Sequence, residues 1–240
     1  MQTKNSYGPS YWRAAAKELK NTKSLVFASF IVVLRIVVKA FKIPLAAGLS
    51  VTFDCYVNAL GSLIYGPLVG LAVGAVSDTL GYLVFPSGVY FLPFILTEML
   101  SSFIFGLFFW KKRITVPRVL TAKFMVNLIC NIILTSLFMK WMYVFLGDEK
   151  ATTYNVINLV RIVKNLVLFP AESVLISLII GAFIPALKSM KLISANQESL
   201  VFEKRHIAVV AATAVLSVAL VLFYIFFLKD FVSANNFKLF

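Results

Sequence analysis

The chain is dominated by long apolar runs, each bounded by charged residues, proline or glycine. Seven of these runs approach the roughly 20 residues that a helix needs to cross the hydrocarbon core of a bilayer. They occupy residues 24–41, 45–65, 67–85, 90–110, 119–146, 159–187 and 207–228. Since 60% of the 240 residues are hydrophobic and only 14% are charged, the sequence excludes a soluble globular domain and predicts an all-α, polytopic membrane helix bundle.

The charged residues are mostly bases, and the formal net charge is +13. In a soluble domain this excess would suggest nucleic-acid binding, but membrane proteins concentrate bases in their cytoplasmic segments. Here the bases gather before the first span, after the fourth and after the sixth: Lys4, Arg13, Lys17, Lys20 and Lys23; Lys111, Lys112, Arg113, Arg118 and Lys123; Lys188, Lys191, Lys204 and Arg205. We therefore expect a multi-pass protein of the cell membrane with a cytoplasmic N-terminus and no nucleic-acid partner.

This orientation divides the chain into three regions. Residues 1–23 form a basic cytoplasmic segment, residues 24–190 a six-helix membrane domain, and residues 191–240 a cytoplasmic loop with an extra C-terminal transmembrane helix. The tight turn Tyr65-Gly66-Pro67 is expected at the cytoplasmic face, and the turn Phe85-Pro86-Ser87-Gly88 at the outer face.

Ionisable residues interrupt several spans, although each costs roughly 2.5–3.5 kcal/mol near the bilayer centre. Such side chains face a cavity, a partner charge or a substrate. The outer half of the bundle is expected to hold Arg35, Lys39, Asp78, Arg161, Lys164 and Asn165, and the middle to hold Asp54, Asn58, Glu98 and Glu172. This set predicts a polar cavity that opens outward. The alternative for any single residue is an internal ion pair: Arg35 with Asp78, or Lys164 with Glu172.

Two groups of polar side chains recur at helical spacing. Arg161, Lys164 and Asn165 share one helix face, because they are spaced i, i+3 and i+4. Arginine matches a carboxylate and lysine adds a point charge, so this face suits an anionic ligand; the alternative is snorkelling at the membrane interface. Asn127 and Asn131 present amides that could read a heteroaromatic ring or bridge two helices.

The third and fourth spans combine small residues with aromatic ones. Glycines recur every four residues in GPLVGLAVG, which lets another helix approach closely. The turn that follows carries Tyr82, Tyr90 and Phe91, ahead of a helix that contains Glu98. Aromatic rings at a cavity mouth can stack on a flat ligand; anchoring at the membrane interface is the alternative.

The sequence carries no motif of a familiar enzyme or metal site. GxxxxGK[ST], HExxH and GxSxG are all absent. Cys55 and Cys130 lie inside apolar runs, and His206 stands beside two bases at the start of a span. We therefore expect a protein that is not an enzyme, hydrolyses no ATP itself and binds no metal.

The block from Tyr65 to Phe109 resembles the substrate-binding S components of energy-coupling factor (ECF) vitamin transporters, and is most similar to the folate-specific members. The segments that carry the resemblance are GPLVGLAVGAVSDTLGYL, the FPSG turn with the YF pair, and FILTEMLSSFIFGLFF. The stretch Arg161-Ile162-Val163-Lys164-Asn165, which leads to Phe169-Pro170-Ala171-Glu172, fits the same comparison. The likeness extends over residues 24–190.

The resemblance implies a six-helix protein that captures a vitamin from outside the cell. Its partners would be a transmembrane coupling subunit and two ATP-binding subunits, which hydrolyse the ATP, while the chain itself holds no cofactor. Members of the family often dock on the coupling subunit through small residues of the first helix. The matching residues here are Ser24 and Ala28, with serine in place of the usual alanine. The seventh span is a second departure from the family pattern.

A folate ligand would suit the predicted polar residues. The amino-pyrimidinone edge of its pterin could be recognised by Glu98 or Asp78 together with the two asparagines of the fifth span. Its anionic glutamate tail would suit Arg161 and Lys164, with Arg35 as a third candidate. The alternatives are an S component for another flat vitamin or precursor, such as riboflavin, niacin or a queuosine precursor, and a membrane scaffold whose charges pair only with one another.

Overall fold

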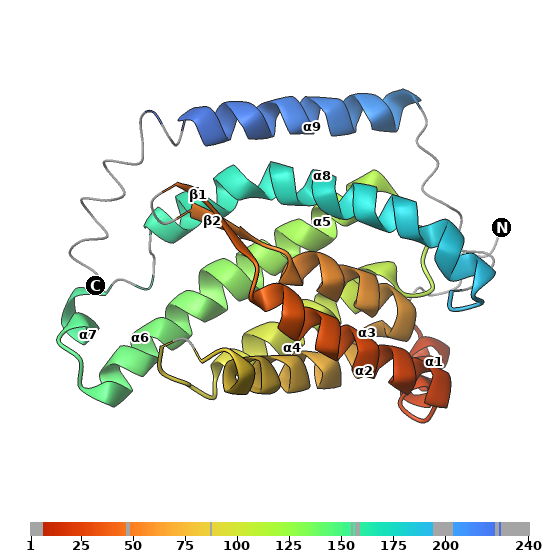
Figure 1. Cartoon of the computed structure of the whole chain (residues 1–240), viewed down its shortest axis with the longest axis horizontal. Coiled ribbons are helices and arrows are strands. Elements are labelled where there is room, and N and C mark those ends of the chain that lie inside the picture. The colour runs from red at the N-terminus through yellow and green to blue at the C-terminus, as the bar shows by residue number, and fades with distance from the viewer. Residues whose placement is uncertain are drawn as a thin grey trace.

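The computed structural model describes residues 7–46, 49–86, 88–154, 156, 159–193, 204–223 and 226. The apolar runs fold into a bundle of helices (Figure 1), which confirms the predicted all-α membrane fold. In chain order the elements are α1 (Pro9–Glu18), α2 (Thr22–Lys39), β1 (Lys42–Ala46), β2 (Leu49–Thr52), α3 (Asp54–Val84), α4 (Phe94–Phe109), α5 (Val116–Met125), the π-helix η1 (Val126–Leu134), α6 (Thr135–Leu146), α7 (Lys150–Thr153), α8 (Leu159–Ser189) and α9 (Lys204–Phe223).

Three stretches of the described chain are long and apolar enough to cross a membrane. By length and composition they are α3, which Gly66 divides into two halves, the continuous segment Val116–Leu146 that joins α5, η1 and α6, and Arg161–Ser189 of α8. Helices α1 and α2 together make a fourth candidate, but they are bent by 70° at the break between them. Helix α4 has 16 residues and is therefore a shorter apolar helix.

The second predicted span begins too early. Instead of a helix from residue 45, strands β1 and β2 form an antiparallel hairpin in which Lys42 pairs with Thr52, and α3 begins only at Asp54. A short apolar run cannot be assigned to helix or strand by periodicity alone. The bundle therefore carries one small sheet between α2 and α3.

Helix α3 reverses at Gly66, where the sequence predicts a tight turn. Gly66 has φ 81° and ψ −176°, a backbone conformation that only glycine adopts readily. A Cβ atom at this position would also lie 2.7 Å from the Trp110 ring. The next residue, Pro67, can start the second half of α3, because the first residue of a helix needs no backbone N–H for an intrahelical hydrogen bond.

Contacts with α4 show that the two halves of α3, residues 54–65 and 67–84, lie side by side. Ser62 Oγ in the first half donates a hydrogen bond to the Ser102 carbonyl oxygen at 3.1 Å. A Cβ on Gly70 in the second half would lie 3.2 Å from the same oxygen. Both halves therefore pack against α4 at Ser102 and run in opposite directions. The glycines of the second half permit this close packing.

The apolar core lies where α3, α4, α5 and α8 meet. Its fully buried members include Leu63, Phe105, Val119, Ile176 and Ile180. Helix α9 packs along α8 (Figure 1) and contains most of the predicted span 207–228, of which residues 224, 225, 227 and 228 lie outside the described residues.

Lys123 corrects the predicted distribution of bases. The sequence groups it with the cytoplasmic loop, but it lies in α5 and is only 1% exposed. Its Nζ atom forms an ion pair with Glu172 Oε2 at 2.9 Å and donates to Cys55 Sγ at 3.2 Å. Glu172 thus pairs with Lys123 and not with Lys164, because a carboxylate from α8 reaches the inward face of α5, a contact that linear spacing does not encode.

Candidate binding cavity

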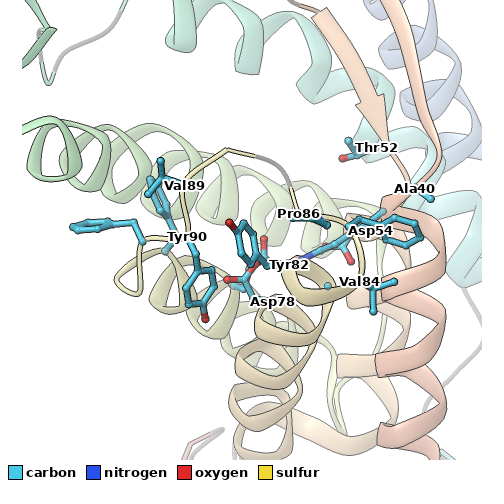
Figure 2. A pocket seen from close by; sticks show the side chains of 15 residues that line it. Ala40, Thr52, Asp54, Asp78, Tyr82, Val84, Pro86, Val89 and Tyr90 are labelled. Atoms are coloured by element: carbon cyan, nitrogen blue, oxygen red, sulfur yellow. Dashed lines mark hydrogen bonds and ion pairs between the residues drawn. The ribbon is translucent and has the colours of Figure 1, made fainter. Parts of the chain in front are cut away.

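A cavity of about 860 Å³ opens at one end of the bundle, between the end of α2, the hairpin, both ends of α3 and the start of α4 (Figure 2). We call this end the cavity end. A volume of this size lies within the roughly 300–1,000 Å³ range of small-molecule sites. Its lining residues are Lys39, Ala40, Thr52, Asp54, Asp78, Gly81, Tyr82, Val84, Phe85, Pro86, Val89, Tyr90, Phe91, Phe94 and Glu98.

One wall of the cavity is aromatic and is held by the turn between α3 and α4. The rings of Tyr82 and Tyr90 lie 4.8 Å apart, centroid to centroid. Tyr82 donates its hydroxyl hydrogen to the Gly88 carbonyl oxygen at 3.0 Å, and the Tyr90 hydroxyl lies 3.1 Å from Thr79 Oγ1. The wall is therefore fixed from both sides and can present ring faces to a flat ligand.

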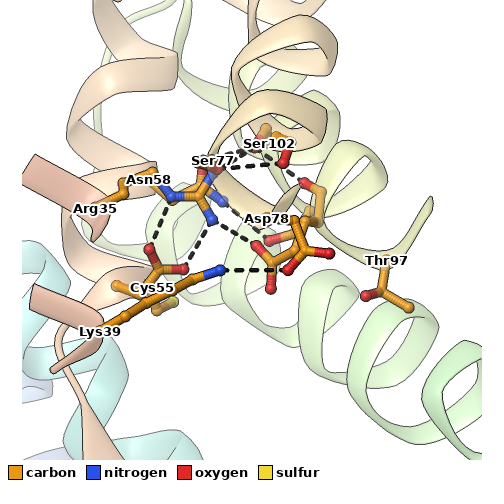
Figure 3. A network of polar contacts seen from close by, with 12 residues as sticks. Arg35, Lys39, Cys55, Asn58, Ser77, Asp78, Thr97 and Ser102 are labelled. Atoms are coloured by element: carbon orange, nitrogen blue, oxygen red, sulfur yellow. Dashed lines mark hydrogen bonds and ion pairs between the residues drawn. The ribbon is translucent and has the colours of Figure 1, made fainter. Parts of the chain in front are cut away.

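Arg35 lies beneath the cavity and joins three elements (Figure 3). Its Nε and Nη2 atoms donate to the two carboxylate oxygens of Asp54, at 2.8 and 2.7 Å, and Nη2 also donates to Glu98 Oε2. The Arg35 side chain is fully buried, whereas the Glu98 side chain is 29% exposed. The guanidinium fork thus neutralises two carboxylates that line the cavity.

Polar side chains behind Arg35 complete this network (Figure 3). Ser102 Oγ donates to Asn58 Oδ1 at 2.7 Å and lies 3.4 Å from Arg35 Nη1. Asn58 Nδ2 in turn donates to Ser101 Oγ at 3.2 Å. All the groups are paired, as buried polar groups must be in an apolar bundle, so the network fixes α2, α3 and α4 relative to one another.

A second ion pair lies at the rim of the cavity. Lys39 Nζ is 3.3 Å from Asp78 Oδ1, and the two side chains are 24% and 21% exposed. The pairing predicted for Arg35 with Asp78 is therefore wrong: Asp78 pairs with Lys39, one helical turn further along α2, where the second half of α3 ends. Because this pair is partly exposed, a ligand can compete for either partner more easily than for the buried Arg35.

The predicted binding residues divide into two sets in space. Glu98, Asp78, Tyr90 and Phe91 line the cavity, and Arg35 supports it from below. The second set, on η1 and α8, is absent from the cavity lining: Asn127, Asn131, Arg161, Lys164 and Asn165.

Amide contacts bridge helices in this second set. Asn131 Nδ2 donates to Asn127 Oδ1 at 3.0 Å and to Asn165 Oδ1 at 3.3 Å. Asn165 Nδ2 donates to the Arg161 carbonyl oxygen at 2.9 Å. The asparagines therefore connect η1 to α8, as in the helix-bridging alternative, and their contact with a ligand stays a prediction.

Several lining residues were missed by sequence reasoning. Lys39 and Asp54 carried a signal, a charge inside an apolar span, but were not selected as ligand contacts. Thr52 carried no such signal, because its position at the cavity depends on the hairpin.

The predicted docking residues, Ser24 and Ala28, are buried at the end of the bundle opposite the cavity. Ser24 Oγ donates a hydrogen bond to Glu18. The docking role of these residues stays a prediction.

The sequence and the fold match known proteins. A family model described as "ECF-type riboflavin transporter, S component" matches residues 19–168. A folate transporter FolT of Clostridium novyi is 30% identical over 66% of this chain and 88% of its own, and a FolT of Leuconostoc mesenteroides is 28% identical over 63% and 81%. A structure titled "Crystal structure of FolT bound with folic acid" has 29% identity and a TM-score of 0.54, covering 64% of this chain and 89% of the other.

The family model covers the part of the chain that builds the cavity, from α2 to the start of α8. The predicted family is confirmed, and the function follows at the level of the family. S components bind a vitamin without a cofactor, are not enzymes, and associate with an energy-coupling module whose partner subunits carry the ATPase. The chain is therefore a multi-pass membrane protein that belongs to the substrate-binding S components of ECF transporters.

Proposed function

We propose that this S component binds folate, captures it from the extracellular side and delivers it with an ATP-driven energy-coupling module. The observation that carries the proposal is the cavity itself, which combines an aromatic wall with three carboxylates, Asp54, Asp78 and Glu98. The relatives named as folate transporters, at 28–30% identity, support the same ligand.

The pterin end of folate fits the acidic part of this cavity. A pterin edge presents an amino group and a ring N–H side by side, and a carboxylate accepts two such parallel hydrogen bonds. Glu98 and Asp78 each offer a carboxylate that is partly exposed. The Tyr82 and Tyr90 rings could cover the flat face of the same ring system.

The glutamate tail of folate requires cations. Lys39 is the base in the cavity lining, and a tail carboxylate could take the place of Asp78 as its partner. Arg161 and Lys164 remain proposed contacts for the tail, although they lie on α8 outside the lining. Arg35 acts on the ligand through the two carboxylates that it orients.

The proposed transport cycle needs further subunits. The partners would be a transmembrane coupling subunit and two ATP-binding subunits, as in the family that the sequence resembles. The cavity end would face the outside and the N-terminus the cytoplasm, because the exposed bases gather at the other end of the bundle.

Riboflavin is the second candidate, since the matching family model is described as a riboflavin transporter component. The pyrimidine edge of a flavin carries one N–H between two carbonyl oxygens, so it offers fewer donors to a carboxylate than a pterin does. Riboflavin also lacks an anionic tail to pair with Lys39. The acidic lining therefore favours the pterin.

The deciding experiment is equilibrium binding of a vitamin panel to the purified protein, together with the absorption spectrum of any co-purified ligand. Folate should bind at least about tenfold more tightly than riboflavin or niacin, a difference of about 1.4 kcal/mol. Glu98→Gln should remove much of that preference, because an amide cannot accept both pterin donors. Tighter binding of riboflavin would replace the proposal, and binding of none of the panel would overturn the assignment of folate.

A further inference from the structure

The end of the bundle opposite the cavity carries a short amphipathic helix, α1. It meets α2 at 70° and so cannot continue that span across a membrane. Ring contacts anchor α1 to the bundle: Tyr11 lies 5.2 Å from Trp110, and Trp12 stacks at 6.1 Å on Phe103 but stays 36% exposed. Ala15, about one turn further along α1, is 1% exposed. Helix α1 is therefore a fixed part of the fold at this end of the bundle (Figure 1), in contact with residues at the end of α4.

Bases from the connection between α4 and α5 strengthen this attachment. Lys112 Nζ lies 4.2 Å from the centroid of the Tyr7 ring and 5.3 Å from that of Tyr11. Lys111 Nζ lies 4.3 Å from the centroid of the Trp110 ring. The contacts of Lys112 with the two tyrosines help to hold α1 in one orientation, so the faces that it turns away from the protein are defined.

The outward surface of α1 has an apolar sector and a basic sector. Trp12 and Leu19, which are 36% and 43% exposed, lie two turns apart on one side. Arg13 and Lys17 are exposed one turn apart beside them, and Lys20 follows just after the helix ends. The acid of this helix, Glu18, is turned away, because it accepts hydrogen bonds from Asn21 and Ser24.

The neighbouring surface has the same charge. Lys111 and Arg113 are exposed on the connection after α4, and Lys191 is exposed after α8. Tryptophan favours the headgroup level of a bilayer, and a basic sector beside an apolar one is typical of helices that lie in the plane of an anionic interface. The arrangement therefore complements the phosphodiester groups and negative charge of an anionic leaflet.

We propose that Arg13, Lys17 and Lys20 of the α1 surface bind the headgroups of anionic phospholipids while Trp12 and Leu19 enter the interface. This surface gives the protein a lipid-binding site at the end remote from the cavity. It enriches anionic lipid around α1 and fixes the depth of this end of the bundle in the membrane. The inference does not depend on which vitamin the cavity takes.

The test uses the full-length protein in nanodiscs of phosphatidylcholine and phosphatidylglycerol at a ratio of about 7:3, with one of the two lipids brominated at a time. Bromine quenches tryptophan on contact. Trp141→Phe removes the tryptophan at the cavity end, and Trp110 is only 2% exposed, so Trp12 becomes the main reporter. Per lipid, brominated phosphatidylglycerol should quench at least about twice as strongly as brominated phosphatidylcholine, and salt near 0.5 M should reduce this preference.

The triple variant Arg13→Gln, Lys17→Gln, Lys20→Gln should lose the preference. The matched control Arg13→Lys, Lys17→Arg, Lys20→Arg keeps the charge at the same positions and should retain it. Trp12→Phe should remove most of the quenching, and thermal melting should show that every variant is folded. Equal quenching per lipid by the two lipids in the parent protein, or a preference that survives in the glutamine variant, would overturn the proposal.

Discussion

The two ends of the bundle use charge in opposite ways. At the cavity end, Arg35 and Lys39 are paired with carboxylates, and the pairs are buried or partly buried. At the α1 end, Arg13, Lys17 and Lys20 are exposed. The difference shows that the same basic residue types can serve two purposes. Paired with carboxylates inside the bundle, they order a binding cavity; exposed on α1, they form a positively charged surface.

The cavity end also differs in how its side chains are ordered. The Arg35 network ties three elements together beneath the cavity, so the orientation of Glu98 depends on a residue that no ligand needs to touch. At the α1 end, aromatic rings and cation–π contacts place the helix, and its exposed bases need no fixed partner. If this comparison is correct, loss of one charge should be severe at the first end and mild at the second.

The largest expected effect is that of Arg35→Met. It leaves Asp54 and the partly exposed Glu98 without the fully buried cation between them, and breaking a buried ion pair in this way costs about 3–5 kcal/mol. The melting temperature in detergent should fall sharply, and vitamin binding should be lost. Lys17→Met at the α1 end is the control and should leave the melting temperature nearly unchanged. Equal effects of the two variants would contradict the contrast between the ends.

Lys123→Met tests whether a buried pair away from the cavity behaves in the same way. It removes the cation from Glu172 and should cost about 3 kcal/mol or more, whereas the double variant with Glu172→Gln should regain most of the loss, because no buried charge is then left alone. Melting curves of the two single variants and the double variant measure the coupling. A double variant no more stable than Lys123→Met would show that the pair itself is required.

Gly66→Ala probes the turn on which the placement of both halves of α3 depends. The positive φ angle and the nearby Trp110 ring should together cost about 2–3 kcal/mol. Gly88 is a matched control, since it also has a positive φ of 71° but no atom within 4 Å of an added Cβ. Gly88→Ala should therefore lower the melting temperature less than Gly66→Ala.

Arg161→Ala asks whether the anionic end of the ligand reaches α8. Folate affinity should fall by about tenfold, or about 1.4 kcal/mol, if this arginine contacts the glutamate tail. Arg118→Ala, in α5 near its start, should leave the affinity unchanged. Equal affinities of the two purified variants would defeat the assignment and leave Lys39 as the cation for the tail.

The smallest effect on stability is expected for Lys39→Met. Its pair with Asp78 is partly exposed, so the loss should be about 1 kcal/mol or less. Folate binding should nevertheless weaken, because the variant removes the cation of the cavity lining. Thermal melting and equilibrium binding of the same preparation separate the two effects; an unchanged affinity would place the tail elsewhere.

The sequence predicted much of the fold because a membrane span is a long run of apolar residues, which can be recognised from residue type alone. Six of the predicted spans begin or end within a few residues of helices in the structure, and the turn at Gly66 was expected from Gly-Pro alone. The prediction of helical spans failed at residues 42–52, where a short apolar run forms a hairpin. Lys123 was misplaced for a related reason, since a base at the start of a span can turn either toward water or toward a carboxylate on another helix.

By itself, the sequence determined the class of protein, a membrane bundle with charges where lipid would exclude them, since each such charge needs a compensating partner. It also singled out Asp78, Glu98, Tyr90 and Phe91, which line the cavity. Only the tertiary structure decided which charges meet. Partner choice depends on the reversal of α3 and on the packing of α2 and α4 against it, and these long-range contacts bring Arg35, Asp54 and Glu98 together across 63 residues of chain.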